Sequence, residues 1–169
     1  MIGLTIPIGD DEIRKLHVGD VVRIFGTLYC GRDAVLPKIC ADAEAGTLAR
    51  LGVDLAGGVM FHTAVSPAGI GPTSSNKVEI EGSFATLSGA GVKMHLGKGA
   101  ISKETIAELD RLNAVYAVIP PVTALLGSKT GDVEVAAYPE LGMEALHRVK
   151  AEGYEVIIAA AHGKSIYDT

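Results

Sequence analysis

Residues 21–34 read Val-Val-Arg-Ile-Phe-Gly-Thr-Leu-Tyr-Cys-Gly-Arg-Asp-Ala, and their pattern is the one from which we infer the fold class. β-Branched and aromatic side chains are frequent in residues 21–28, which predicts a strand there. A helix is predicted over residues 36–50, provided that Pro37 lies in its first turn. This arrangement leaves Arg32 near a helix N-terminus, where backbone N–H groups and the helix dipole favour anions.

The same alternation of strand and helix continues along the rest of the chain. Further strands are predicted over residues 5–8, 57–62, 92–96, 114–119, 133–138 and 156–161. Further helices are predicted over residues 10–16, from Ser102 to Leu112, over residues 122–126, and from Pro139 toward Gly153. The first strand is expected at a sheet edge because Pro7 has no N–H, and the unalternating last strand is expected to be buried on both faces. Strands that alternate with helices indicate one α/β domain over residues 1–169.

Composition and charge exclude several functions. Among 169 residues, 48% are apolar, the formal net charge is −5, and no Lys or Arg cluster reaches four in a row. This pattern argues against a nucleic-acid surface, although two or three aimed cations suffice to bind a small anion. The longest strongly apolar stretch, residues 112–128, contains Pro120-Pro121, which excludes a simple membrane helix. The short apolar N-terminus has no basic start, so we expect no signal peptide and a cytoplasmic protein.

The chain has two cysteines, Cys30 and Cys40. Two thiols are too few for a four-thiolate zinc site or an iron–sulfur cluster, and we expect both to be semi-buried in the core. They are close enough in sequence to pair, although nothing indicates an oxidising compartment.

The chain has five histidines. Three of them, His62, His95 and His162, are expected to be core or surface histidines with satisfied hydrogen bonds. These three lack the spacing of metal ligands relative to one another. We expect His17 and His147 to lie on the surface.

Residues 71–77 read Gly-Pro-Thr-Ser-Ser-Asn-Lys and follow a long run, residues 55–76, that carries no formal charge when His62 is neutral. Gly and Pro set the backbone, the hydroxyls donate hydrogen bonds, and Lys77 adds a positive charge. Such a loop suits a small anionic ligand. The same residue types dominate ordinary turns, so composition alone leaves both interpretations open.

Three cations, Arg32, Lys77 and Lys98, each follow a predicted strand. Ligands of open α/β sheets gather at the carboxyl ends of the strands, so we expect these cations to form one positively charged site. Lys98 lies between two glycines, which lets the backbone come close to a ligand. Alternatives exist: Arg32 could form a salt bridge to Asp33 or another surface carboxylate, and Gly-Lys-Gly is also a common turn composition.

Three segments together resemble a known family. They are Gly26-Thr27-Leu28-Tyr29-Cys30-Gly31-Arg32-Asp33-Ala34, Gly71-Pro72-Thr73-Ser74-Ser75 and Gly97-Lys98-Gly99-Ala100. In this order and with these separations they resemble the C-terminal portion of class I fumarate hydratases and the related L-tartrate dehydratase β subunit. The resemblance covers essentially the whole chain and includes residues 138–145. It implies a swivelling β/β/α fold with a mixed sheet core and flanking helices.

The resemblance also implies a second subunit and a cofactor. In two-subunit members this portion is a separate β chain, and the α chain carries a 4Fe–4S cluster on three cysteines. We therefore expect this chain to bind no cofactor itself and to share a site for a small dicarboxylate with a cluster-bearing α subunit. The expected reaction is the reversible hydration of fumarate to L-malate. The alternatives are L-tartrate dehydration and a non-catalytic role in anion binding or assembly.

Roles for individual residues follow from the same resemblance. Arg32 and Lys98 match positions that hold the substrate carboxylates, and Thr73 matches the threonine implicated in proton transfer. A threonine hydroxyl is a poor base unless its pKa is lowered, so Thr73 could instead orient the substrate by hydrogen bonding. We also expect Ser74 and Lys77 to bind substrate.

The chain departs from the family pattern at two places. Lys77 stands where these enzymes usually have arginine; it keeps the charge but loses the bidentate fork. Val35 and Leu36 follow Ala34, where the family usually has alanine and then histidine. If that histidine recognises or protonates substrate, its loss changes the preferred substrate. Neither change removes the positive charge of the site.

Overall fold

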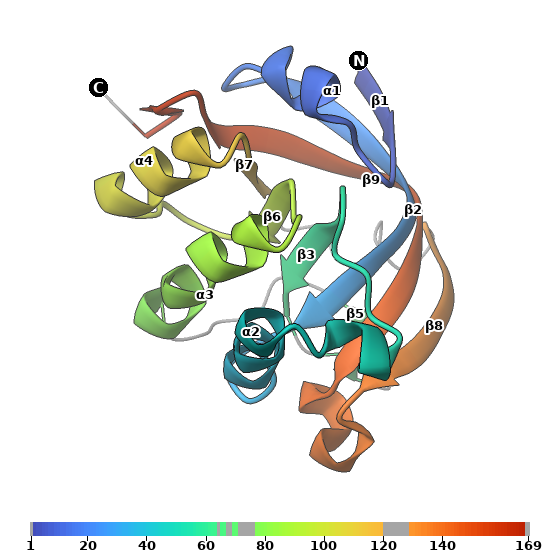
Figure 1. The fold of residues 1–169 in the computed structure, drawn as a ribbon. Coiled ribbons are helices and arrows are strands. Elements are labelled where there is room, and N and C mark those ends of the chain that lie inside the picture. Colours follow the sequence, from blue (N-terminus) through green and yellow to red (C-terminus); the bar gives the residue numbers. More distant parts are fainter. Residues whose placement is uncertain (1, 64, 67–68, 71–76, 120–128, 168–169) are drawn as a thin grey trace.

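The computed structural model describes residues 2–63, 65–66, 69–70, 77–119 and 129–167 (Figure 1). For residues 66, 69, 70 and 77–80, the description covers the backbone only. The helix predicted over residues 122–126 and the hydroxyl-rich residues 71–76 lie outside these ranges, and what was expected of them stays a prediction.

A barrel of five strands forms the centre of the molecule (Figure 1). Its strands are β2 (Val21–Gly31), β3 (Val59–His62), β6 (Met94–Gly97), β7 (Val115–Val118) and β9 (Leu146–Ala161). The first four run parallel, while β9 is antiparallel to both β7 and β2 and closes the barrel between them. This closed mixed sheet, with helices at its flank, confirms the predicted swivelling β/β/α fold.

Further strands extend the barrel. They are β1 (Ile2–Thr5), β8 (Thr130–Ala137) and β10 (Lys164–Ser165), while β4 (Val65–Ser66) and β5 (Gly69–Ile70) form a separate pair. β1 runs parallel to the first half of β2, and β8 pairs with the first part of β9. The first strand therefore overlaps the predicted range of 5–8 only at Thr5. Ile6 N still donates to the Phe25 carbonyl at 2.8 Å, but Pro7 has no N–H with which to continue the ladder.

Three helices lie side by side on the outer face of the barrel (Figure 1). They are α2 (Leu36–Ala45), α3 (Lys77–Gly89) and α4 (Lys103–Arg111); the short α1 (Asp10–Arg14) lies near β1, and η1 (Leu48–Leu51) and η2 (Pro139–Glu144) are 3₁₀ turns. As predicted, Pro37 lies in the first turn of α2 and Ser102 caps α4, accepting a hydrogen bond from Thr105 N at 3.2 Å. α2 is shorter than predicted because Gly46 takes a left-handed conformation, with φ of 74°.

The long helix predicted from Pro139 is wrong. Only the 3₁₀ turn η2 follows Pro139, and Leu146 begins β9, a strand of 16 residues. Leu146 and Val149 have the spacing of one helix face, but in a strand a separation of three places them on opposite faces. Leu146 accordingly packs outside the barrel and Val149 inside it. Gly153, expected at a helix end, is the residue left unpaired at a β-bulge opposite β2.

No sequence pattern predicted α3. Residues 78–81 read Val-Glu-Ile-Glu, an alternation typical of a strand, and Gly82 lowers the helix propensity further. The helix lies in the connection between β3 and β6, after β4 and β5, and covers the outer face of the sheet (Figure 1). Lys77 is therefore the first residue of a helix rather than part of a loop that follows a strand.

Separate apolar clusters fill the barrel and the space under the helices. Each barrel strand contributes to the interior, where the side chains include Ile24, Phe61, Leu96, Val115 and Tyr154. Outside the barrel, Leu36, Ile39, Met60 and Leu87 form one cluster, and Phe84, Ile106, Leu109 and Tyr116 form another. Successive strand residues point to opposite faces, so the barrel strands are buried on both. Residues 156–161 contribute to the interior and to an outer cluster, as predicted.

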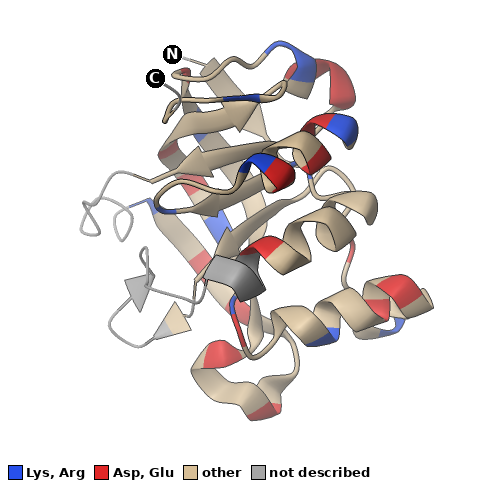
Figure 2. Ribbon diagram, turned by 90° about the vertical axis from the view of Figure 1, so that its left-hand side faces the viewer, with Lys and Arg blue, Asp and Glu red and all other residues tan. Residues whose placement is uncertain are grey.

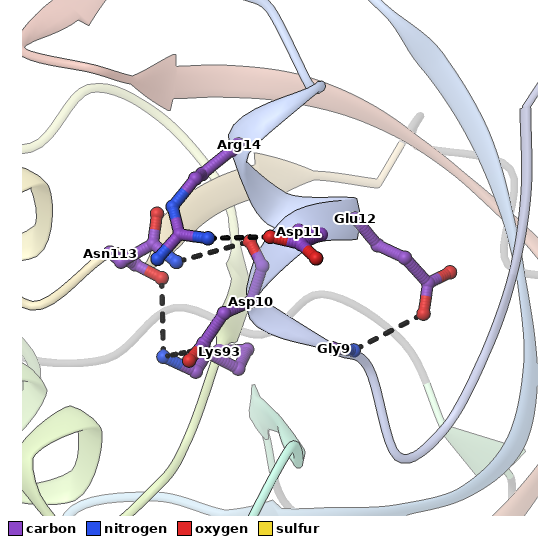
Figure 3. Close-up of polar contacts among 7 residues, drawn as sticks. All are labelled: Gly9, Asp10, Asp11, Glu12, Arg14, Lys93 and Asn113. Carbon is purple, nitrogen blue, oxygen red and sulfur yellow. Dashed lines mark hydrogen bonds and ion pairs between the residues drawn. The ribbon is translucent and has the colours of Figure 1, made fainter.

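Polar contacts fasten α1 to the end of the barrel at which the parallel strands begin, here called the amino edge (Figure 3). Lys93, which directly precedes β6, places its ammonium group 2.6 Å from a carboxylate oxygen of Asp10 in α1. The hydrogen bond and charge of Lys93 lower the pKa of Asp10. The Asn113 side chain, two residues before β7, donates a hydrogen bond to the Asp10 carbonyl at 3.2 Å. These contacts join α1 to two neighbouring barrel strands.

Candidate functional site at the carboxyl edge of the barrel

The four parallel strands end in register, and the row of their last residues is here called the carboxyl edge. The last residues are Gly31, His62, Gly97 and Val118. The residues that follow them, and leave the sheet at this edge, are Arg32, Thr63, Lys98 and Ile119. Only β3 separates β2 from β6, so the backbones of Arg32 and Lys98 lie two strand spacings apart, which is about 10 Å. The structure thus brings two of the predicted cations to one edge.

Arg32 is held by the turn that connects β2 to α2. Its carbonyl accepts hydrogen bonds from the N–H groups of Val35 and Leu36, at 3.1 and 3.0 Å. Its side chain is 26% exposed, and Nε lies 3.3 Å from a carboxylate oxygen of Glu144. This contact is an ion pair without the alignment of a hydrogen bond, and Nε has no hydrogen-bond partner within the described part of the chain. Arg32 therefore forms a salt bridge, with Glu144 as the partner, and its guanidinium still has a buried donor without a hydrogen bond.

Lys98 is held by the loop between β6 and α4. Tyr116 donates a hydrogen bond from its hydroxyl to the Gly99 carbonyl at 3.0 Å. Burial raises the pKa of Tyr116, so its hydroxyl keeps the proton for this bond. Gly97 leaves room for it, because a Cβ there would come within 3.1 Å of the Tyr116 hydroxyl oxygen. Lys98 itself is exposed.

The other predicted site residues are described in part or not at all. Thr73 and Ser74 lie outside the described residues. Lys77 is the first residue of α3 and is described by its backbone only. Because α3 belongs to the crossover from the carboxyl end of β3 to the amino end of β6 and ends shortly before β6, its first turn lies on the side of the carboxyl edge. The roles of these three residues stay predictions.

Two buried histidines near the carboxyl edge form a feature that the sequence did not predict. His62 is 2% exposed and His95 is 0% exposed. His62 Nε2 lies 2.9 Å from His95 Nδ1, and His95 Nε2 lies 2.8 Å from the Ser88 hydroxyl oxygen. Phe84 stacks on His95, with ring centroids 4.2 Å apart. Burial lowers the pKa of His62 to about 3 and lowers the pKa of His95 as well, so both rings are neutral at pH 7.

The expectation of satisfied core histidines is correct for His95 and wrong for His62. Both ring nitrogens of His95 have partners, whereas His62 Nδ1 is buried with no hydrogen-bond partner among the residues described. In the sequence, the sign of this feature is one histidine in each of two apolar strands. Only the pairing of β3 with β6 shows that His62 and His95 are in contact. His147, expected at the surface, is 7% exposed, and its Nδ1 lies 2.9 Å from the Ala145 carbonyl oxygen.

The two cysteines lie in different apolar clusters. Cys30 is buried in the barrel interior, and Cys40 packs against the outer cluster that contains Leu36. Both are free. Burial raises the pKa of both thiols, that of Cys40 to about 11, so neither is a thiolate at pH 7. Within the described ranges, no three His, Cys, Asp or Glu side chains gather as metal ligands, and these donors do not fit an iron–sulfur cluster.

Charged residues of both signs are interspersed along the ribbon (Figure 2). None of the described helices has the length and apolar character that crossing a membrane requires.

The barrel and its outer helices define a mixed α/β domain of the swivelling β/β/α class, with Arg32 and Lys98 at one edge. The chain belongs to the fumarase C-terminus family, whose sequence model matches residues 1–169.

Named relatives are similar over nearly the whole chain. It is 30% identical to a provisionally named L(+)-tartrate dehydratase β subunit of Methanocaldococcus jannaschii, over 93% of this chain and 86% of the relative. It is 28% identical to the L(+)-tartrate dehydratase β subunit of Escherichia coli K12, over 96% of this chain and 85% of the relative. A provisionally named class I fumarate hydratase of Geobacillus stearothermophilus is 29% identical over 99% of this chain, which spans 34% of that relative's length.

Proposed function

We propose that this chain is the β-type part of an iron–sulfur-dependent hydro-lyase that adds water to, or removes it from, a four-carbon dicarboxylate. The observation that carries the proposal is the placement of Arg32 and Lys98 at one edge of the barrel, two strand spacings apart. Two long cationic side chains that start about 10 Å apart can each reach one carboxylate of a small substrate lying between them. Membership of the fumarase C-terminus family supports the same reaction class.

In this proposal, Arg32 and Lys98 bind the two carboxylates and Lys77 adds a further positive charge. Hydrogen bonds to charged groups contribute about 1.5–3 kcal/mol each, so the pair both positions the substrate and stabilises charge that develops on a carboxylate as a proton leaves the neighbouring carbon. Thr73 moves that proton, or orients the substrate through its hydroxyl, and Ser74 donates a further hydrogen bond. A threonine base requires a neighbouring group that lowers its pKa.

A cluster-bearing α subunit completes the site. When bound, a 4Fe–4S cluster supplies a Lewis acid toward the hydroxyl and carboxylate of the substrate. The described residues of this chain do not fit its ligation, since the thiols are buried and protonated and no ligand group is assembled. We therefore assign the cluster ligands to the partner and expect this chain to be inactive alone.

The named relatives favour L(+)-tartrate over fumarate as the substrate. Two of the named relatives, of which this chain covers more than four-fifths, are L(+)-tartrate dehydratase β subunits. This reverses the order expected from the sequence resemblance, in which fumarate came first. The Geobacillus relative keeps fumarate as the second candidate.

Anaerobic reconstitution tests the proposal. The chain is combined with a cluster-loaded α-type subunit from the same genome, and dehydration of L(+)-tartrate and L-malate and hydration of fumarate are assayed side by side. We expect turnover of one of these substrates by the complex and none by either chain alone. The control variant is Arg111→Ala on α4. The Arg111 guanidinium pairs with Glu108 at a distance of 2.6 Å, and this pair lies away from the proposed site. A stable, cluster-loaded complex that converts none of the three would refute the enzymatic proposal and leave the assembly alternative.

A further inference from the structure

Ser88, His95 and His62 form a continuous hydrogen-bonded chain that runs along β6 and β3 toward the carboxyl edge. Ser88 lies in the last turn of α3, His95 is the second residue of β6, and His62 is the last residue of β3. The two contacts measure 2.8 and 2.9 Å, and all three residues are at least 94% buried. At the outer end of the chain, His62 Nδ1 has no partner among the described residues. A buried polar atom in that state is rare in folded proteins, and a water, an ion or a ligand normally satisfies it.

Two proton arrangements are compatible with this chain, because a neutral imidazole carries one N–H and one lone pair. In the first, Ser88 donates to His95 Nε2, His95 donates from Nδ1 to His62 Nε2, and His62 presents an Nδ1–H. In the second, every bond is reversed and His62 presents a lone pair. The burial that lowers the pKa of both histidines excludes a charged ring as a third arrangement at pH 7.

The surroundings of His62 select the first arrangement. His62 is in register with Gly31, so it ends its strand beside Arg32, and Lys98 follows the strand on the other side. Cations at this edge attract ligand oxygens, which accept hydrogen bonds. A lone pair on Nδ1 would repel such an oxygen, whereas an N–H would bind it.

We propose that His62 is a ligand-binding residue that donates a hydrogen bond from Nδ1 to an anionic oxygen at the carboxyl edge, and that Ser88 and His95 are positioning residues that hold its tautomer. This deepens the proposed function and rests on it for the identity of the ligand, a dicarboxylate. A neutral donor with a fixed direction adds orientation to a site whose other contacts, Arg32 and Lys98, are charges on flexible side chains.

NMR spectra of the ring nitrogens, recorded on the chain with ¹⁵N-labelled histidine, show which nitrogen carries the proton, and this test does not depend on enzyme activity. We expect the proton of His62 on Nδ1 and a bare Nε2, with the proton of His95 also on Nδ1. Replacing the hydroxyl in Ser88→Ala should remove this preference, so that both histidines show mixed tautomers. A His62 proton on Nε2 in the unmodified chain would overturn the inference, whatever the enzyme does.

A pair of variants tests the direction of the bond in the reconstituted enzyme. The Asn side chain in His62→Asn can place an amide N–H near the position of Nδ1, whereas Gln in His62→Gln reaches toward His95 and offers no outward donor. We expect KM for the dicarboxylate to rise about tenfold in His62→Gln and no more than about threefold in His62→Asn. The control is His162→Gln, which replaces a histidine whose ring bonds to the Leu16 carbonyl. Equal KM values in the two His62 variants would refute the proposal, while absent turnover in the unmodified complex would refute the proposed function instead.

Discussion

The polar groups at the two ends of the parallel strands differ in whether their hydrogen bonds are satisfied within the described chain. At the amino edge, Lys93 pairs with Asp10, and Asn113 bonds the Asp10 carbonyl, so each group has a partner (Figure 3). At the carboxyl edge, Arg32 forms an ion pair with Glu144, but its Nε and His62 Nδ1 are buried without a hydrogen bond to any described residue. Unsatisfied buried groups cost stability, and a fold retains them where something else satisfies them. The comparison teaches that one edge serves the fold, and it supports our proposal that the other serves a ligand.

The largest expected effect is that of Arg32→Ala. Loss of a charged hydrogen-bonding partner for a carboxylate should lower kcat/KM of the reconstituted enzyme about 100-fold, or about 2.7 kcal/mol. Arg14→Ala is the matched control at the amino edge, where Arg14 pairs with Asp11 at 2.6 Å, and it should leave kcat/KM unchanged. Similar kinetics for the two variants would remove Arg32 from the site.

As pH falls, the histidines near the carboxyl edge should lower the free energy of unfolding at a higher pH than the Lys93–Asp10 pair at the amino edge does. Burial lowers the pKa of His62 and His95, so the unfolded chain takes up protons near pH 6.5 while the folded chain does not, and stability is lost as pH falls below that value. From pH 7.5 to 5.5, the free energy of unfolding should fall by about 1.4 kcal/mol for each histidine. Denaturant titrations at both pH values measure it. His95→Gln, which cannot titrate, should remove about half of the loss; an undiminished loss would assign it to other groups.

Lys98→Ala should have a smaller effect than Arg32→Ala because an exposed ammonium forms weaker, less directed contacts than a partly buried guanidinium. We expect kcat/KM to fall about tenfold, with Lys98→Arg recovering part of it. Lys103→Ala, at the start of α4, is the control for charge alone. If Lys103→Ala and Lys98→Ala reduce the rate equally, the effect is long-range electrostatics rather than contact.

Tyr116→Phe should act on Lys98 through the loop. It removes the hydrogen bond to the Gly99 carbonyl, which costs about 1 kcal/mol in the free energy of unfolding. We also expect kcat/KM to fall by about two- to fivefold, because the loop that carries Lys98 is less well held. In the Lys98→Ala background the kinetic effect should disappear. A persisting loss there would show that Tyr116 acts by another route.

Lys93→Gln should give the smallest effect and should be confined to stability. Lys93 lowers the pKa of Asp10, so their ion pair stabilises the fold above the ordinary pKa of an aspartate and is lost as pH falls below about 4. We expect a slightly lower urea midpoint at pH 7, a difference that fades at pH 3, and unchanged turnover. A marked loss of activity would contradict the assignment of separate tasks to the two edges.

Sequence patterns predicted most of the barrel and two members of its cationic edge. The β-branched run before Arg32 and the Gly-Lys-Gly at Lys98 carried local signals strong enough to place both residues at strand ends. No pattern predicted α3, because residues 78–81 alternate between apolar and charged side chains as a strand does. The spacing of three between Leu146 and Val149 predicts a helix at the start of β9, because the spacing alone does not reveal that the two side chains face different clusters.

What the sequence determined by itself is the series of strands, the cap at Ser102, the acidic net charge and the family, because these depend on local propensity and on residue identity in order. Only the tertiary structure decided that β9 pairs with β2 and closes the barrel, that Arg32 meets Glu144, and that His62 and His95 touch. Those contacts join residues far apart in the chain, and they form because burying both faces of the strands fixes one register. Local sequence carries no record of that register, so the pairing of buried polar groups becomes visible only in the folded chain.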